Sequence, residues 1–223
     1  MAKNLCALIP SYNEARTIGA LVTELKARDM VVYIVDDGSI DDTAMIASAH
    51  GAVVVKHVKN LGKGASMREG FKHILKRGFD AVVVMDGDGQ HAVTDIDNFL
   101  KKMDETNADI VIGNRMSDTS TMPRIRIYTN QFMSFLISAL AKQRIPDSQS
   151  GFRLIKCPVL QDIHLQSSNY EIESEMIIEA SRHGFKIESA PIRTIYSDER
   201  SHINPIVDAL RFIGFLFKSL FRR

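Results

Sequence analysis

The chain has 223 residues and a formal net charge of +1, and 45% of its residues are hydrophobic while 25% are charged. Such values are typical of one soluble domain with a sizeable core, and the near-neutral charge gives no reason to expect a nucleic acid partner. No window approaches the roughly 20 uncharged apolar residues of a membrane-spanning helix, and the first residues lack the pattern of a signal peptide.

The first half of the chain alternates short apolar runs with segments of helical periodicity. Strands are predicted at residues 5–9, 31–35, 53–55, 81–85 and 110–112, and helices at 18–25, 41–51, 64–76 and 95–103. Asn13 is available to cap the first helix, and Asp41 or Asp42 the second. This alternation predicts an α/β fold with a mostly parallel, doubly wound sheet.

The second half of the chain, after Gly113, is less regular. Loops are predicted at 116–123 and 144–153, helices at 124–141 and 171–183, and one or two strands at 186–192. Pro191 suits an edge strand, because proline lacks the N–H that a central strand needs. No internal repeat or linker interrupts the chain, so we expect one domain over residues 1–204 and an amphipathic helix over 205–223.

Polar residues follow three of the predicted strands, at positions 10–14, 36–39 and 86–91. The carboxyl ends of parallel strands lie on one edge of a sheet, where open α/β sheets bind ligands. Asp86 and Asp88 are separated by one glycine and could share a hard cation such as Mg²⁺ or Mn²⁺. The alternative is an Asp-Gly turn whose carboxylates are solvated. Asp36 or Asp37 could bind ribose hydroxyls or a base N–H, or could cap a helix.

A glycine-containing segment, Asn60-Leu61-Gly62-Lys63-Gly64-Ala65, opens the third predicted helix. Glycine lets a ligand approach the backbone, and a helix N-terminus favours phosphate. The spacing matches neither of the common phosphate-binding fingerprints. A turn that requires positive φ explains the glycines equally well.

Taken together, five segments resemble glycosyltransferase family 2, and above all its dolichyl-phosphate mannosyltransferases and bacterial polyprenyl-phosphate glycosyltransferases. The segments are Pro10-Ser11-Tyr12-Asn13-Glu14, Val35-Asp36-Asp37-Gly38-Ser39, Asn60-Leu61-Gly62-Lys63-Gly64, Asp86-Gly87-Asp88-Gly89-Gln90-His91 and Ser150-Gly151-Phe152-Arg153. They occur in the family's order between residue 5 and about residue 200. The resemblance implies a GT-A fold, a UDP- or GDP-linked sugar donor, a Mg²⁺ or Mn²⁺ ion and an inverting transfer.

The resemblance also implies a role for each matching residue. The donor site would comprise Pro10, Tyr12, Glu14, Asp36, Asp37, Gly62, Lys63, Asp86 and Gly87. Asp37 would contact the base, and Asp36 would support its loop. The metal ligands would be Asp86, Asp88 and Gln90, the catalytic residues Asp88, Arg115, Asp147 and Arg153, and the acceptor-binding residues Ser150, Arg153 and His202. Both arginines would face phosphate groups, which their paired donors suit. Asn114 replaces the small residue usual before the first of them.

The need for a general base depends on the acceptor. An alcohol must lose a proton to a carboxylate, and Asp147 is the candidate for that role. A lipid monophosphate, with a second pKa near ~6, is already largely dianionic at neutral pH and needs no base. Asp147 would then only position the metal or the acceptor, or cap a loop. Glu171, Glu173 and Glu175 are expected to be solvated charges on a helix.

The predicted helix at residues 205–223 is relevant to the kind of acceptor and to the location of the protein in the cell. It combines a broad apolar face with Arg211, Lys218, Arg222 and Arg223, so it could lie at a membrane surface or pack on this domain or another subunit. Cys6 and Cys157 lack metal-type spacing, which favours a reducing compartment. We therefore expect a cytoplasmic protein, peripheral at the inner face of the membrane.

The function expected from these observations is sugar transfer from a nucleotide-sugar to an acceptor, most simply a polyprenyl phosphate. A soluble family member that modifies a saccharide or small molecule is the main alternative. A sugar-nucleotide nucleotidyltransferase would more typically begin with a basic, glycine-rich loop, and a non-catalytic binding module would be favoured by a broken metal motif. The sequence leaves the sugar, the base and the oligomeric state open.

Overall fold

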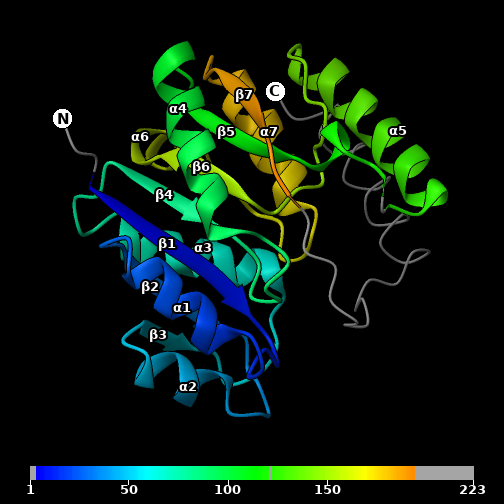
Figure 1. Cartoon of the computed structure of the whole chain (residues 1–223). Coiled ribbons are helices and arrows are strands. Elements are labelled where there is room, and N and C mark those ends of the chain that lie inside the picture. The colour runs from blue at the N-terminus through cyan, green and yellow to red at the C-terminus, as the bar shows by residue number, and fades with distance from the viewer. Residues whose placement is uncertain (1–3, 121, 194–223) are drawn as a thin grey trace.

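A computed structural model of the protein describes residues 4–120 and 122–193. Seven strands form one sheet in the order β3-β2-β1-β4-β6-β5-β7 (Figure 1). The strands are β1 (Leu5–Ser11), β2 (Val31–Asp36), β3 (Val53–Lys56), β4 (Ala81–Val84), β5 (Ile110–Asn114), β6 (Arg153–Lys156) and β7 (Ile187–Pro191). Within the described ranges β6 alone runs antiparallel to its neighbours, β4 and β5. The expected mostly parallel sheet is therefore confirmed.

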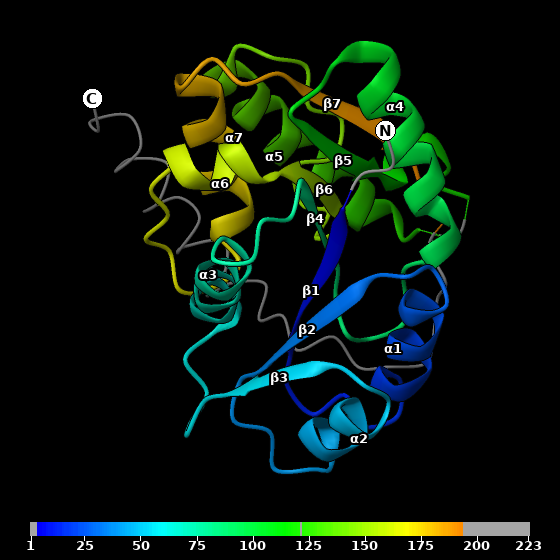
Figure 2. The ribbon, with the colours of Figure 1, turned by 90° about the vertical axis from the view of Figure 1, so that its left-hand side faces the viewer.

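Helices cover both faces of the sheet, as Figure 2 shows when the sheet is seen along its edge. One face carries α1 (Ile18–Lys26), α2 (Thr43–Ala49) and α4 (Ile96–Thr106), and the other carries α3 (Lys63–Ile74), α6 (Cys157–Asp162) and α7 (Ile172–Arg182). A short 3-10 helix, Val93–Asp95, leads directly into α4, and a second one, Arg115–Ser117, directly follows β5. This two-sided arrangement buries both faces of every central strand.

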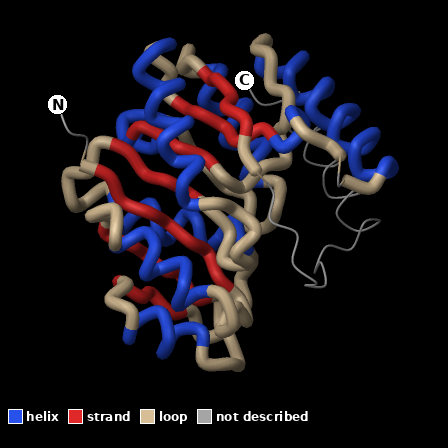
Figure 3. The backbone as a smooth tube through the Cα atoms, in the orientation of Figure 1, coloured by secondary structure: helices blue, strands red, loops and turns tan. Residues whose placement is uncertain are grey.

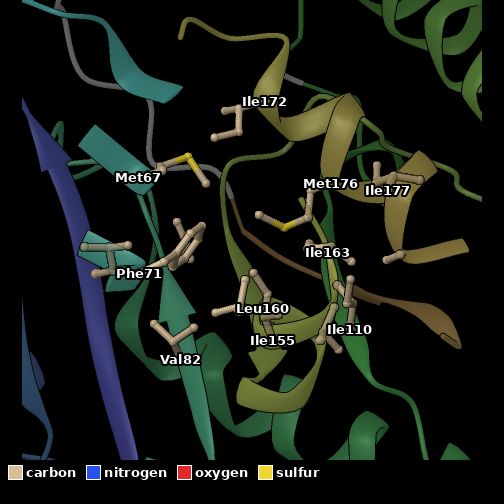
Figure 4. Packing of buried hydrophobic residues seen from close by; sticks show 14 of the residues in the cluster. Met67, Phe71, Val82, Ile110, Ile155, Leu160, Ile163, Ile172, Met176 and Ile177 are labelled. Carbon is tan, nitrogen blue, oxygen red and sulfur yellow. The ribbon is translucent and has the colours of Figure 1, made fainter. Parts of the chain in front are cut away.

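Alternate residues of each central strand enter opposite cores. On β1, Cys6 and Leu8 pack on the side of α3, whereas Ala7 and Ile9 pack on the side of α1. The alternation follows from the two-residue repeat of a strand. Figure 4 shows the α3–α7 core, in which side chains from α3, β4, β5, β6, the α6 region and α7 meet. Burial of each such side chain contributes roughly 1.5–3 kcal/mol.

The predicted elements of the first half are confirmed, with one local correction. Asn13 does not cap α1: its backbone has φ +59°, and its side-chain oxygen instead accepts a hydrogen bond from Ile40 N at 3.0 Å. At α2 the expected capping is seen at Asp41, whose carboxylate accepts a hydrogen bond from Thr43 N at 3.1 Å. The side chain of Asp42 makes no such cap.

The second half differs from its prediction at residues 153–162. Residue 153 begins a sheet strand rather than ending a loop, and α6 follows directly. A four-residue strand that begins with Arg153 and ends with Lys156 has too little periodicity to be predicted from sequence. Its place in the sheet depends on pairing with β4 and β5, which are distant in the chain. The range predicted as one or two strands, 186–192, contains a single edge strand, β7, that includes Pro191 as expected. The predicted helix 205–223 lies outside the described residues.

Helix α5 (Arg124–Ala141) has the predicted boundaries but an unusual distribution of side chains. Ile125, Tyr128, Phe132 and Phe135 are 63–76% exposed, whereas Ser134 is buried. The inward face is mixed. Ile137 and Ala141 are buried in the core, while two serines hold the returning chain: Ser134 Oγ accepts a hydrogen bond from Ser148 N, and Ser138 Oγ accepts one from Ile145 N, both at 2.9 Å. No helix among the described residues is sufficiently long and apolar to cross a membrane.

Candidate functional site

The loops that follow β1 and β4 contact each other at the edge of the sheet where these strands end. Thr17 Oγ1 donates a hydrogen bond to Gly87 O at 2.6 Å, and a Cβ atom on Gly87 would lie 2.9 Å from Ser11 Oγ. Figure 3 shows loops gathered along this side of the sheet. The predicted convergence of the polar strand ends is therefore seen in the structure.

The expected donor residues after β1 lie at this edge with different exposures. Pro10 is buried within β1, Glu14 is half-buried, and Tyr12 is 36% exposed. The Glu14 side chain passes close to Gly87, since a Cβ atom there would lie 3.2 Å from Glu14 Cγ. Tyr12 and Glu14 thus lie just after the end of β1, whereas Pro10 is part of the buried strand.

Asp37 holds the segment 57–62 in place. Its carboxylate accepts hydrogen bonds from Leu61 N at 2.9 Å and Gly62 N at 2.8 Å, and its Oδ1 lies 2.7 Å from His57 Nδ1. Asp36 accepts one from Ser39 N at 3.0 Å, and its Oδ2 has no hydrogen-bond partner within the described chain. Asp36 thus supports its own turn, and Asp37, which is 4% exposed, holds the neighbouring loop. Contact between Asp37 and a base stays a prediction.

The N-terminus of α3 is covered by protein backbone. Ala65 N donates to Ser168 O at 3.1 Å, and a Cβ atom on Gly62 would lie 2.3 Å from that same oxygen. Gly62 also has φ +96°, a conformation that favours glycine. The glycine therefore serves a tight turn and a close backbone approach, and its expected role in donor binding stays a prediction.

Lys63 joins the end of β4 to α7. Its Nζ lies 2.5 Å from Asp86 Oδ1 and 2.6 Å from Glu173 Oε1. Burial by itself would lower the pKa of Lys63, but the charges of Asp86 and Glu173 outweigh burial and raise it above its ordinary value. For Asp86, burial opposes ionisation, yet Lys63 and His91 hold its pKa well below the usual range. At neutral pH these groups therefore form an ionised cluster.

Asp88 lies beside this cluster and differs from Asp86 in its environment. Burial, and then the negative charge of Asp86, raise the pKa of Asp88, while a hydrogen bond from Gln90 N at 2.9 Å opposes that rise. The two carboxylates are thus close enough to repel each other, which a divalent cation would relieve. Their hard oxygen donors fit Mg²⁺ or Mn²⁺. The described residues contain no group of three or more His, Cys, Asp or Glu side chains able to hold a metal.

His91 supports the same loop, although no role for it follows from the sequence motif. Its Nε2 lies 3.6 Å from Asp86 Oδ2, and its ring is 5.0 Å from that of Phe152. The imidazole is 8% exposed, so it packs between the Asp86 carboxylate and the core.

Arg115 and Asp147 form a two-pronged ion pair. Arg115 Nε and Nη2 donate to the carboxylate at 2.8 and 2.9 Å, and Arg115 N adds a third hydrogen bond at 3.1 Å. Burial would lower the pKa of Arg115, but Asp147 raises it above its ordinary value. Asp147 is fully buried. Paired in this way, its carboxylate is a poor candidate for the general base that the sequence suggests.

Arg153 is a structural residue in this fold. Its side chain is fully buried and donates to the carbonyl oxygens of Ser150, Glu173 and Ser148 at 2.9, 2.6 and 3.0 Å. Burial lowers its pKa, while the charges of Glu173 and Asp147 oppose that change. These contacts support a structural role, and the expected contact between Arg153 and a phosphate stays a prediction. Ser150 is also fully buried, its expected acceptor contact stays a prediction, and His202 lies outside the described residues.

Two glutamates of α7 are site residues that the sequence analysis misses. Glu173 is 5% exposed and Glu175 is 2% exposed, which corrects the expectation of solvated charges. Glu175 accepts hydrogen bonds from Gln166 N and Ser167 N, and so holds the segment that covers α3. The sequence carries a signal for the burial of Glu173. Met176, an apolar residue, lies three residues later and therefore on the same face of the helix.

Comparisons with known proteins agree with this architecture. A family model described as "Glycosyl transferase family 2" matches residues 6–164. A UDP-N-acetylglucosamine–dolichyl-phosphate N-acetylglucosaminyltransferase from Methanococcus voltae is 30% identical over 219 residues, covering 88% of this chain and 87% of that protein. A polyprenol monophosphomannose synthase from Mycolicibacterium smegmatis is 28% identical over 199 residues, covering 83% and 75%.

Solved structures show the same fold. Glucosyl-3-phosphoglycerate synthase from Mycobacterium tuberculosis, in complex with Mn²⁺, uridine-diphosphate and phosphoglyceric acid, has a TM-score of 0.73 and 19% identity, covering 98% of this chain and 78% of that chain. At this identity the likeness concerns the fold alone, which is the GT-A-like α/β fold that the motifs imply.

Proposed function

The chain belongs to glycosyltransferase family 2, and we propose that it moves a sugar from a UDP- or GDP-linked donor to a polyprenyl phosphate, with inversion and with a divalent metal. The names of the relatives from Methanococcus voltae and Mycolicibacterium smegmatis, which specify a dolichyl phosphate and a polyprenol monophosphomannose respectively, support the acceptor class.

The observation that carries the acceptor assignment is the state of Asp147. This carboxylate is the base candidate from sequence, yet it is fully buried and bound by the guanidinium and N–H of Arg115. An alcohol acceptor would need a free base, whereas a phosphate monoester attacks as the dianion. The geometry therefore favours a phosphate acceptor.

We assign the metal to Asp86 and Asp88, with Gln90 as a further oxygen ligand. A bound Mg²⁺ or Mn²⁺ would stabilise the negative charge that grows on the departing nucleoside diphosphate. Lys63 and Arg115 add positive charge near these carboxylates. Lys63 lowers the pKa of Asp86, and the charge of Asp86 helps to raise the pKa of Arg115. Tyr12 and Glu14, at the exit of β1, are assigned to the nucleotide.

A lipid acceptor requires contact with a membrane, and α5 has a surface suited to it. The α5 stripe, defined as Ile125, Tyr128, Phe132 and Phe135, is exposed along one side of the helix. Its neighbours at the start of the helix, Arg124 and Arg126, are also exposed and would face anionic headgroups. We therefore place the protein at the cytoplasmic face of a membrane, bound peripherally.

The function is tested by pairing donors with matched acceptors. UDP- and GDP-sugars are incubated with a polyprenyl phosphate or with the polyprenol of the same chain length, and nucleoside diphosphate release and lipid product are followed. We expect transfer to the phosphate and none above background to the alcohol. Equal transfer to both, or transfer only to a soluble saccharide, would contradict the proposal.

The membrane contact is tested on the α5 stripe. Replacement of Phe132 and Phe135 by Ser removes two exposed aromatic side chains and should abolish flotation with anionic liposomes, because each buried aromatic contributes roughly 1.5–3 kcal/mol. The matched control is Val58→Ser, an exposed apolar residue elsewhere on the chain. Donor binding should be unchanged in both. Flotation of the double variant at the wild-type level would show that the stripe does not bind lipid.

A further inference from the structure

The ammonium group of Lys63 contacts the carboxylate of Asp86, to which the metal is assigned. Nζ lies 2.5 Å from Asp86 Oδ1, while Asp86 Oδ2 has His91 Nε2 at 3.6 Å. A Cβ atom on Gly151 would lie only 2.6 Å from Oδ2, so the Gly151 backbone passes close to that oxygen. The Asp86 side chain is still 30% exposed, so a cation can reach it. A metal that takes up the position of the ammonium group beside Oδ1 displaces Lys63 from that oxygen.

Glu173 provides the place to which that group can be displaced. Its Oε1 lies 2.6 Å from Nζ, and its side chain is 6% exposed, so it needs a cationic partner whether or not a metal is present. A lysine ammonium has three donors on a flexible stem, so it can bind two carboxylates and release one of them.

The net charge of the side chains around Lys63 also favours replacement of its ammonium group on Asp86 by a divalent cation. Lys63 contributes +1, and Asp86, Asp88 and Glu173 contribute −3 when ionised, which gives 1 − 3 = −2. One divalent cation would neutralise the sum of these four groups. Arg115 and Arg153 add positive charge nearby, but in the described chain Lys63 is the cation in ion-pair contact with the carboxylates of both Asp86 and Glu173.

We propose that Lys63 is a positioning residue that takes the place of the divalent cation on Asp86 while the metal is absent, and that metal binding leaves its ammonium group on Glu173 alone. The inference rests on the proposed function, because it takes Asp86 as a metal ligand. It assigns Glu173 the role of holding Lys63 in both states.

Two substitutions should change metal affinity in opposite directions. Lys63→Met removes the competing cation, so Mn²⁺ should bind about tenfold more tightly, equivalent to about 1.4 kcal/mol. Glu173→Gln leaves Lys63 with Asp86 as its anionic partner, so Mn²⁺ should bind about tenfold more weakly. A purely structural role predicts that both variants bind Mn²⁺ equally or less well. The opposite signs therefore distinguish the two roles.

The measurement is Mn²⁺ titration by electron paramagnetic resonance, without nucleotide. Lys72→Met is the control, since Lys72 lies on the same helix but pairs with Glu69 at the surface, and it should bind Mn²⁺ like the wild type. Mn²⁺ should also raise the thermal midpoint of Lys63→Met more than that of the wild type, because tighter binding stabilises more. If Lys63→Met does not fold, Lys63→Gln, which removes the charge but keeps a polar head, is titrated in its place and should also bind Mn²⁺ more tightly than the wild type.

Equal or weaker Mn²⁺ binding by folded Lys63→Met, or equal or tighter binding by Glu173→Gln, overturns the role proposed for Lys63. A second titration in the presence of UDP separates this failure from that of the proposed function. If the wild type binds no Mn²⁺ even with UDP, the metal-dependent function is wrong. If it binds Mn²⁺ and the Lys63 substitution has no effect, only the displacement of Lys63 is wrong.

Discussion

Replacement of Asp88 by Asn is expected to reduce kcat by roughly 10²–10³-fold while the fold is retained. The amide keeps the size of the side chain but removes a charged oxygen ligand, and a catalytic metal supplies several kcal/mol of charge stabilisation. Asp88 is only partly buried, and its carboxylate accepts a hydrogen bond from Gln90 N that an amide oxygen can also accept, so little stability should be lost. Initial rates at saturating donor, with circular dichroism of both proteins, measure the effect.

The control for this prediction is Asp97→Asn on α4, where the carboxylate is 63% exposed and pairs with Arg28. It should leave kcat unchanged. Excess EDTA should reduce wild-type turnover to the level of Asp88→Asn. Near-normal turnover of Asp88→Asn in excess EDTA would mean that this carboxylate holds no catalytic metal.

Replacement of Arg153 by Met should lower the free energy of unfolding by about 3–5 kcal/mol. The guanidinium donates to three carbonyl oxygens, those of Ser148, Ser150 and Glu173, and each buried acceptor left unsatisfied costs about 1–3 kcal/mol. Urea unfolding followed by circular dichroism gives the change, provided that the m-value is unchanged.

A matched control lies on the same strand. Lys156 pairs with Asp109 near the surface, at 3.0 Å, with the two side chains 29% and 27% exposed. Lys156→Met should therefore cost about 0.2–1 kcal/mol. If Arg153→Met unfolds like the wild type but loses affinity for nucleotide or lipid phosphate, the phosphate-binding role implied by the sequence motif would be right and the structural role wrong.

The fold was predictable because its signals are local. The apolar runs of β1, β2 and β4 and the helical spacing of α1 and α5 lie within single segments, and their alternation determines a parallel sheet. Strand β6 was not predictable in this way. Its four residues become a central strand only through pairing with β4 and β5, which lie far away in the chain.

The site was predictable in its location and less so in its individual contacts. The motifs place Asp86, Asp88 and Lys63 together correctly, because all follow from strand ends and a helix start. They do not distinguish a residue that faces a ligand from one that holds a loop. Asp37 and Arg153 are of the second kind, since burial and backbone partners, which no motif records, decide their roles.

The pair of Arg115 and Asp147 also affects how freely this part of the chain can vary. The two residues stand at the start and end of the excursion that carries α5, and their hydrogen bonds hold its ends together at 2.8–2.9 Å. Once the ends are fixed, doubling the length of such an excursion costs only about 0.6 kcal/mol in closure entropy. Insertions between residues 116 and 120, ahead of α5, should therefore leave the sheet and the charged cluster intact. Exchange of α5 and the residues that follow it must keep their inward side, because Ile137, Ala141 and Ile145 are buried in the α3–α7 core. The exposed side of this excursion can vary within that limit, so different acceptors could be accommodated there without change to the first half of the sheet.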